Sequence, residues 1–296
     1  MSKLNTLNTL NNSNRLNEDQ WAPNIATTDE NLSINGLYQE ASLPSLGRVI
    51  FTVTPIHGPT AALFNVKTKA DQTGIEVIRR EVEVFETTPK RTTISAESLQ
   101  DIIKQFGEDG LKMVAKYLRG VANQEENQKT IEFLQTNAVS AGSITLSDSK
   151  IVDACWREIS MKVQDCVLKM NSKHRRTYKA FVVMPYKYGA SLMSLFADMN
   201  NAEYADIESL FIGSSGLTDW FVNPDNEDEK IYVGLMDKDG LGKECAVFSP
   251  YTDEIKRTLD PKTGNPGYFI HNRFAITISP LHSSTDPLLM YFTVSE

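Results

Sequence analysis

The sequence predicts an α+β fold, and three observations predict it. Strand-like patterns occur early in the chain, at 48–85, and again towards its end, from 230 to 294. Two long helical patterns lie between them, at 108–137 and 149–171. The order is therefore strands, long helices and strands again, not the regular strand–helix alternation that builds a parallel sheet.

The first 46 residues differ from the rest of the chain. They are rich in Asn and Leu, and Leu4, Leu7 and Leu10 recur at every third position. Two interpretations stay open: a short amphipathic helix that docks on a partner, or a mobile tail. Under either interpretation this segment is an arm and not part of the core.

The next segment predicts a strand followed by a long β-hairpin. Residues 48–54 alternate as a strand, and Gly58 and Pro59 then interrupt the pattern. A second strand follows, 70–74 reads as a turn, and 75–85 alternates again, so 61–86 forms a hairpin. Both of its faces carry charges, so the hairpin is expected either to extend into solvent or to lie on a neighbouring subunit. The candidate contact residues are Lys67, Lys69, Arg79, Arg80, Glu81 and Glu83.

Helical patterns follow. Ser95 is the expected N-cap of a helix that ends at Gly107. A much longer helix is predicted over 108–137, about 45 Å at 1.5 Å per residue, with a polar middle, "NQEENQKT". So long a helix is typical of a spine lying across a flat molecule. Its expected core-facing residues are Leu111, Val114, Leu118 and Leu134.

The remainder predicts one more amphipathic helix and then strands. The helix at 149–171 has an apolar stripe that includes Cys155 and Cys166. Further strands are expected at 178–185, 230–236, 244–250, 267–280 and 288–294, with a helix at 188–199.

Composition excludes several classes of protein. The net charge is −8, so the chain lacks the basic face that a general nucleic-acid binder needs. The three cysteines match no zinc spacing, and two of them read as small buried residues of a protein in a reducing compartment. No apolar run approaches the roughly 20 residues that cross a membrane.

No motif indicates catalysis. The four histidines form no HExxH pair, and phosphate-loop and nucleophile-elbow motifs are absent. The loop "GSSG" at 213–216 has no base nearby in sequence, and "DKDGLGKE" at 237–244 lacks the glycine position of a calcium loop. We therefore expect no enzyme, no cofactor and no metal site.

Three segments resemble the major capsid proteins of T4-type tailed bacteriophages. They are "TPIHGPTAALFNVKTK", "AESLQDIIKQFGEDGLKMVAKYLRG" and "FSPYTDEIKRTLDPKTGNPGYFIHNRFAITISP", in the order that the family has them. The third is the most specific. It holds the family's pattern of prolines and aromatic residues at Pro250-Tyr251, Asp260-Pro261, Thr263, Pro266, Arg273-Phe274 and Pro280.

The resemblance implies the HK97-like capsid fold. It implies an N-terminal arm at 1–46, an extended loop and its base at 47–91, and a peripheral domain with the spine helix at 92–172. An axial domain would occupy 173–248, and closing strands at 249–296 would return to the peripheral domain. Gly58 and Pro59 would then set the direction in which the hairpin leaves the body.

The implied function is structural. The chain would self-assemble as hexamers, or also pentamers, into a virion shell that encloses double-stranded DNA without binding it tightly. Vertex, portal, scaffold or decoration proteins would be further partners, and synthesis would take place in the cytoplasm of a host bacterium. The alternatives are a pentameric vertex protein, a nanocompartment shell, or a soluble enzyme or ligand-binding domain with an unrecognised site.

Overall fold

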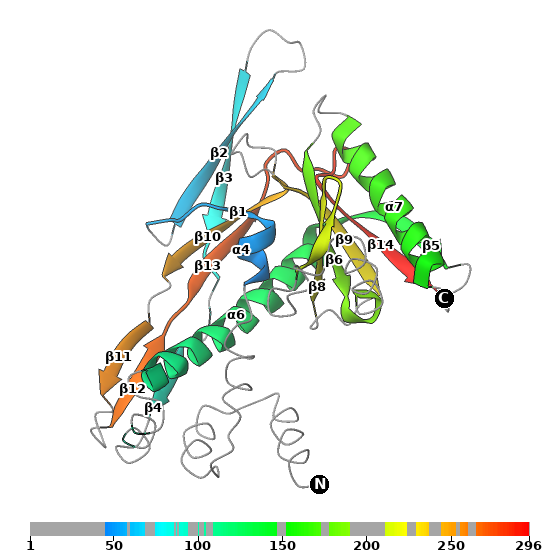
Figure 1. The fold of residues 1–296 in the computed structure, drawn as a ribbon. Coiled ribbons are helices and arrows are strands. Elements are labelled where there is room, and N and C mark those ends of the chain that lie inside the picture. The colour runs from blue at the N-terminus through cyan, green and yellow to red at the C-terminus, as the bar shows by residue number, and fades with distance from the viewer. Residues whose placement is uncertain are drawn as a thin grey trace, which may run out of the picture. The chain divides into compact units, whose positions relative to one another are not determined.

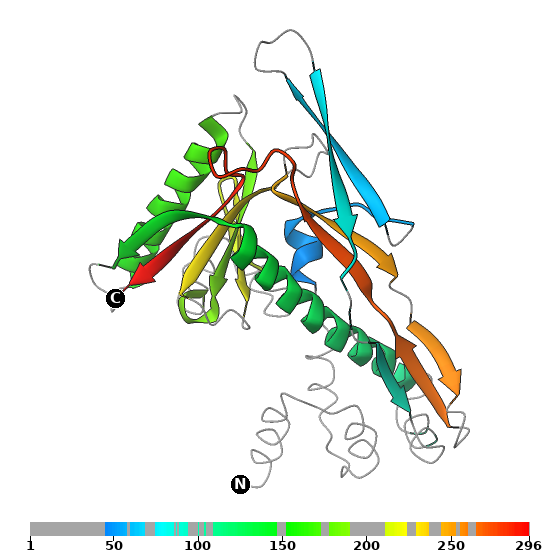
Figure 2. The same cartoon turned by 180° about the vertical axis from the view of Figure 1, so that it is seen from behind.

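The structure is a computed structural model. It describes residues 45–57, 60–68, 75–85, 87, 89–93, 100, 104, 109–146, 152–172, 178–189, 211–223, 229–236, 244–252, 255–259 and 265–295. The chain divides into two compact units, which we take separately (Figures 1 and 2). The first contains Thr88–Ala122 and Asp253–Asn272, and the second contains Leu43–Thr87, Asn123–Thr252 and Arg273–Glu296. The mixture of long helices and mainly antiparallel strands confirms the predicted α+β class.

The first unit has a three-stranded antiparallel sheet in the order β11-β12-β4. Its strands are β11 (Ile255–Leu259), β12 (Pro266–Ile270) and β4 (Lys90–Thr93). Its small core consists of Leu118 and Ala122 from helix α6 together with Ile270 from β12.

Helix α6 spans Asp109–Asn137, which confirms the long helix predicted at 108–137. Its N-terminal half belongs to the first unit and its C-terminal half, from Asn123, belongs to the second. Residues at every fourth position from 118 are buried. Each step of four turns the side chain by only about 40° around a helix of 3.6 residues per turn, so neighbours in this series lie close together while the series as a whole winds around the helix. This buried stripe consists of Leu118, Ala122, Glu126, Thr130 and Leu134.

The second unit is built on a six-stranded mixed sheet in the order β5-β14-β9-β6-β8-β7. Pairs β5–β14 and β6–β8 are parallel, and the other three pairs are antiparallel. The strands are β5 (Val139–Thr145), β6 (Lys179–Pro185), β7 (Phe211–Ser215), β8 (Thr218–Asn223), β9 (Lys230–Met236) and β14 (Leu289–Ser295).

Helix α7 (Val152–Ser172) contacts this sheet at β5 and β9. Ile159, Val163, Cys166 and Met170 form the buried side of the helix, as the apolar stripe of the sequence predicts. The ring of Trp156 lies 4.8 Å from that of Trp220 on β8, centroid to centroid, which adds an aromatic contact to the interface.

A second sheet of the same unit has three strands in the order β1-β10-β13. They are β1 (Thr52–Val53), β10 (Ala246–Thr252) and β13 (Arg273–Ile278). Phe248 and Phe274 stack at 5.2 Å between ring centroids across the antiparallel pair β10–β13. This sheet is the base on which the hairpin stands.

One predicted strand is wrong. Residues 48–54 do not form a continuous strand: helix α4 (Leu46–Ile50) is followed by the two-residue strand β1. Leu46 and Ile50 are both 1% exposed, so a single helical turn buries both ends of the segment against the core. The burial of Leu46 and Ile50 in the folded protein favours a helical turn here, although the sequence alternates as in a strand.

The sequence also missed β4, β5, β7, β8 and β11. Most of the helices expected at 95–107 and 188–199, and all of the arm before Ser45, lie outside the described residues.

Three elements outside 173–248 belong to the same sheet assembly as β6 and β9. Strand β14 pairs with β5 and β9, and helix α7 contacts β5 and β9.

Candidate assembly elements

The predicted hairpin is present as strands β2 (Thr60–Thr68) and β3 (Ile75–Glu83). The two pair antiparallel in an unbroken register from Thr60↔Glu83 to Thr68↔Ile75. No third strand joins them among the described residues, so the ladder is a separate two-stranded sheet that extends from β13 (Figure 1). A two-stranded ladder of this kind is marginally stable by itself.

The base of the hairpin is tied to the body of the second unit. Val82 is 2% exposed and packs with Ile56 and Ala275. The backbone N–H of Phe85 donates to the carbonyl of Phe274 at 2.8 Å, and the two rings lie 5.5 Å apart. The end of β3 near Val82 is therefore anchored. The side chains before it on β3 alternate between partly buried and exposed positions.

The exposed face of β3 carries Val77, Arg79 and Glu81. Val77 is 60% exposed, although it is a large apolar side chain in a strand. Arg79 and Glu81 form an ion pair at 3.5 Å with side chains 63% and 81% exposed, so the pair adds little stability to the fold. This face of β3 is available for contact.

Arg80 makes a contact within its own chain. Its Nη1 donates to the carbonyl oxygens of Ile278, at 2.8 Å, and Ser279, at 3.4 Å, at the end of β13. These bonds occupy one nitrogen of a guanidinium group that has five N–H donors, so the contact of Arg80 to an acidic residue of a neighbouring subunit stays a prediction.

The other predicted residues of the hairpin are placed only in part. The ladder register sets Lys67 opposite Glu76 and Glu83 opposite Thr60. Lys69, Gly58 and Pro59 lie outside the described residues.

The predicted core residues of the spine helix fall in two different cores. Leu118 is 5% exposed in the small core of the first unit, and Leu134 is 0% exposed in the large core of the second. Leu111 and Val114 lie on α6, but the structure does not describe their side chains.

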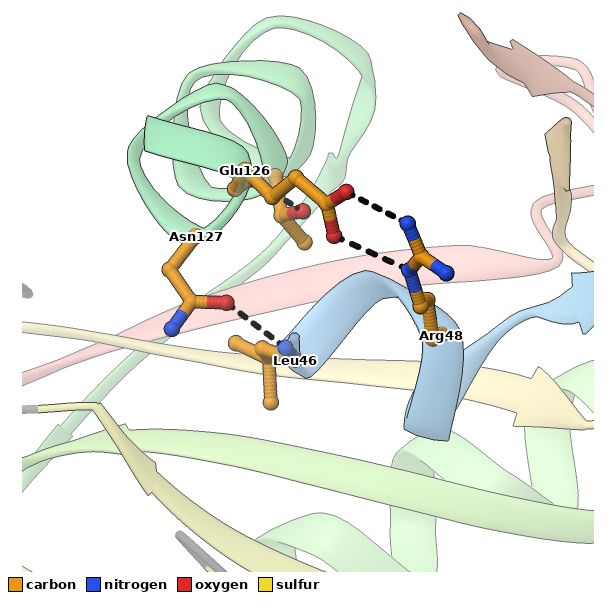
Figure 3. Close-up of polar contacts among 5 residues, drawn as sticks. Leu46, Arg48, Glu126 and Asn127 are labelled. Carbon is orange, nitrogen blue, oxygen red and sulfur yellow. Dashed lines mark hydrogen bonds and ion pairs between the residues drawn. The ribbon is translucent and has the colours of Figure 1, made fainter. Parts of the chain in front are cut away.

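A polar clip, made of Arg48, Glu126, Asn127 and the backbone of Leu46, fastens α4 to α6 (Figure 3). The Arg48 guanidinium donates twice to the Glu126 carboxylate, at 3.1 and 2.8 Å. The Oδ1 of Asn127 accepts the backbone N–H of Leu46 at 2.6 Å, which satisfies one of the free donors at the helix N-terminus. The side chain of Glu126 is 0% exposed and that of Arg48 is 29% exposed, so the carboxylate is buried and the cation is partly sheltered.

Close approach of the backbones makes the clip possible. A Cβ on Gly47 would lie 2.8 Å from Thr130 Oγ1 and 2.9 Å from a ring carbon of Phe248, so only glycine fits between α6 and β10. Thr130 Oγ1 also donates to the backbone carbonyl of Glu126 at 2.7 Å.

Sequence reasoning missed the clip, although a signal for it exists. Glu126 and Thr130 stand on the same fourfold spacing as Leu118, Ala122 and Leu134, which marks both polar residues as buried. The run "NQEENQKT" is thus a contact region of the spine helix and not only a solvated middle.

The described residues offer no catalytic arrangement. They contain no cluster of three or more His, Cys, Asp or Glu that could hold a metal ion. Burial raises the pKa of Cys166 to about 11 and that of Cys245 further, so both thiols stay protonated and unreactive. Among the helices of the described part, none is both long and apolar enough to cross a membrane.

Several solved shell proteins share this fold. The virus-like particle from Pyrococcus furiosus is 9% identical, with a TM-score of 0.53, over 88% of this chain and 97% of that chain. The mature capsid of bacteriophage PhiM1 is 9% identical, with a TM-score of 0.54, over 85% and 87%. The capsid of cyanophage P-SCSP1u is 8% identical, with a TM-score of 0.53, over 83% and 87%. The fold is therefore HK97-like, as predicted.

The sequence itself matches a protein family. A search of the curated proteins found no match. Residues 60–290, by contrast, match the family described as "Major capsid protein Gp23". That family consists of structural proteins of the virion shell and not of enzymes, and its match covers the hairpin, the spine helix, helix α7 and the strands from β4 to β13. The chain belongs to the Gp23 major capsid protein family and is a structural, shell-forming subunit.

Proposed function

We propose that the chain is the major head subunit of a T4-type tailed bacteriophage and that it assembles as hexamers. One observation supports the proposal beyond the family match. Val77 on the ladder β2–β3 is 60% exposed and is flanked by Arg79, and no described residue of its own chain covers this face. Burying the exposed part of this valine would be worth about 1 kcal/mol, which an isolated subunit does not gain. A neighbouring subunit lying against this face would supply the cover.

Arg79 and Glu81 are the proposed polar contacts of this face, together with Lys67, Lys69 and Glu83 of the same hairpin. Each exposed pair contributes only about 0–1 kcal/mol, but a closed shell repeats the contact at every subunit. Gly58 and Pro59 remain the proposed determinants of the direction in which the hairpin leaves the body.

The rest of the proposal concerns the shell as a whole. Helix α6 with the first unit would form the peripheral domain, and the six-stranded sheet with α7 would form the axial domain. The net charge of −8 favours a shell that encloses DNA without gripping it. Vertex, portal, scaffold or decoration proteins are proposed further partners, and the cytoplasm of the host bacterium is the proposed site of synthesis.

Two other assemblies are compatible with the fold. A vertex protein of the same fold would form pentamers, and a nanocompartment shell would hold an enzyme in place of DNA. Counting subunits around each capsomer by electron microscopy separates hexamers from pentamers, and the contents of the particle separate a phage head from a nanocompartment.

The test is a matched pair of substitutions. Val77→Asp should leave the melting of the free subunit within about 0.5 kcal/mol of wild type, because the side chain is exposed, yet it should prevent particle formation. Val53→Asp is the control, since Val53 is 44% exposed on β1, outside the hairpin. The proposal fails if Val77→Asp gives particles with the heat and salt resistance of wild type, or if Val53→Asp abolishes assembly equally.

A further inference from the structure

The loop between β13 and β14, residues 279–288, connects the hairpin to the C-terminal end of the spine helix. Arg80 of β3 donates to the carbonyls of Ile278 and Ser279, where this loop begins. The same Ser279 carbonyl accepts the backbone N–H of His282 at 3.0 Å. The loop therefore supplies one of the two acceptors of Arg80, Ser279 at 3.4 Å, whereas Ile278, at 2.8 Å, belongs to β13.

The ring of His282 fixes the loop at two points. Its Nδ1 accepts the backbone N–H of Leu288 at 3.1 Å, so Nδ1 carries no proton. The proton is then on Nε2, which lies 3.1 Å from the carbonyl of Asn137, the last residue of α6, and donates to it. Both contacts together require a neutral ring.

The surroundings favour that neutral ring. Burial lowers the pKa of His282 below its ordinary value, and the nearby guanidinium of Arg80 lowers it further. The hydrogen bond to Asn137 and the carboxylate of Asp286 act in the opposite direction without reversing the shift. Among the described residues, the charged groups that act on the ring are thus Arg80 from β3 and Asp286 from the loop, and α6 presents a carbonyl.

We propose that His282 and Arg80 are positioning residues that form a proton-sensitive clasp at the base of the hairpin. In its neutral state the clasp holds the loop against α6 and holds β3 against the loop. Protonation places an N–H on Nδ1 opposite the N–H of Leu288, so two donors face each other and that hydrogen bond is lost. The loop then releases the Ser279 carbonyl, so Arg80 loses one of its two acceptors and β3 keeps only the bond to Ile278 of β13.

The sign of the pH effect follows from the direction of the pKa shift. The unfolded chain takes up a proton at about pH 6.5, before the folded chain does. The stabilising effect of the clasp is therefore complete above about pH 6.5 and is lost as the pH falls through the lowered folded-state pKa. The inference does not depend on what the hairpin contacts in a shell.

Hydrogen exchange of the full-length subunit, followed by mass spectrometry and corrected for intrinsic rates, tests the clasp. Between about pH 7.5 and about pH 5.5, protection should fall about tenfold in peptides that contain the Leu288 amide and by a smaller factor in peptides from β3, which keeps the bond to Ile278. His282→Asn keeps an acceptor near the position of Nδ1 and does not titrate, so both responses should disappear. His271→Asn, which changes a histidine of the first unit, should retain both.

Two further variants separate the steps of the clasp. Arg80→Gln should leave the pH response of the Leu288 amide and lower the protection of β3 at both pH values. His282→Gln keeps the donor to Asn137 but lacks the acceptor, so it should resemble acid-treated wild type already at neutral pH, and it serves if His282→Asn does not fold. An unchanged pH response in His282→Asn, its loss in His271→Asn, or a response at Leu288 without one in β3 would overturn the proposal.

Discussion

Removing Arg48 tests whether the polar clip is a structural anchor. Arg48→Met keeps an unbranched side chain but loses the two charge-assisted hydrogen bonds to Glu126 and the guanidinium contact with the Phe248 ring. Breaking a buried charge pair by removing one partner costs about 3–5 kcal/mol. Arg48 is 29% exposed while Glu126 is 0% exposed, so water screens one partner and we expect the lower end, about 3 kcal/mol.

Urea denaturation of the subunit measures this loss as a lower midpoint at an unchanged slope. The matched control lies on the same helix: Lys129 and Glu132 also pair at 2.8 Å, but with side chains 32% and 59% exposed. Lys129→Met should cost less than about 1 kcal/mol, because the pair is largely solvated. The shortest distance is the same in both ion pairs, so a difference in the loss of stability between the two variants measures the effect of burial.

A second substitution identifies the cause of the loss. Glu126→Gln removes the buried charge, so the double variant Arg48→Met/Glu126→Gln should be more stable than Arg48→Met alone, with a coupling of about 1–3 kcal/mol. The reasoning is refuted if Arg48→Met stays within about 0.5 kcal/mol of wild type, or if the two losses simply add.

Three further expectations concern the cores, the backbone and DNA. Leu134→Ala should lower the free energy of unfolding of the subunit by about 2–5 kcal/mol, and Leu118→Ala by an amount near the lower end because its core is small. Wild-type stability of both variants would show that these two side chains are not buried. Gly47→Ala should cost about 1–3 kcal/mol through its contacts with Thr130 and Phe248, and an unchanged midpoint would mean that α4 can move away freely. The purified subunit should not shift duplex DNA at physiological salt, since its net charge is −8, and micromolar binding in a gel-shift assay would contradict this.

Periodicity predicted the elements that are long or alternate clearly. Helices α6 and α7, the β2–β3 ladder and strands β9 and β14 all stand close to where the pattern places them. These elements are defined by residues within one segment, so the information is local. The order of strands in the sheets is not local, and only the resemblance to a family anticipated the HK97-like arrangement.

The misses have physical reasons. Helix α4 has five residues, and it forms because Asn127 caps Leu46 and because Gly47 allows close contact with α6. Strands β7 and β8 meet at a turn in which Gly216 has a φ of +62°, a conformation that favours glycine. The sequence "GSSG" indicated a loop there but not the two strands on either side of it. The bonds of Arg80 to the carbonyls of Ile278 and Ser279 were not foreseen, because a charged residue on a strand does not itself reveal which face is covered.

The position of β14 within its sheet has a consequence for biosynthesis. This strand, Leu289–Ser295, lies between β5, which was made some 150 residues earlier, and β9, as the register Met290↔Val139 and Met290↔Val233 shows. Pairing of such distant segments is slow and comes late in folding. On the ribosome, the sheet therefore stays open at β9 until the chain has been translated through residue 295. A prematurely terminated chain would keep that unpaired edge and an incomplete core, so it would aggregate or be degraded before it could join a growing particle.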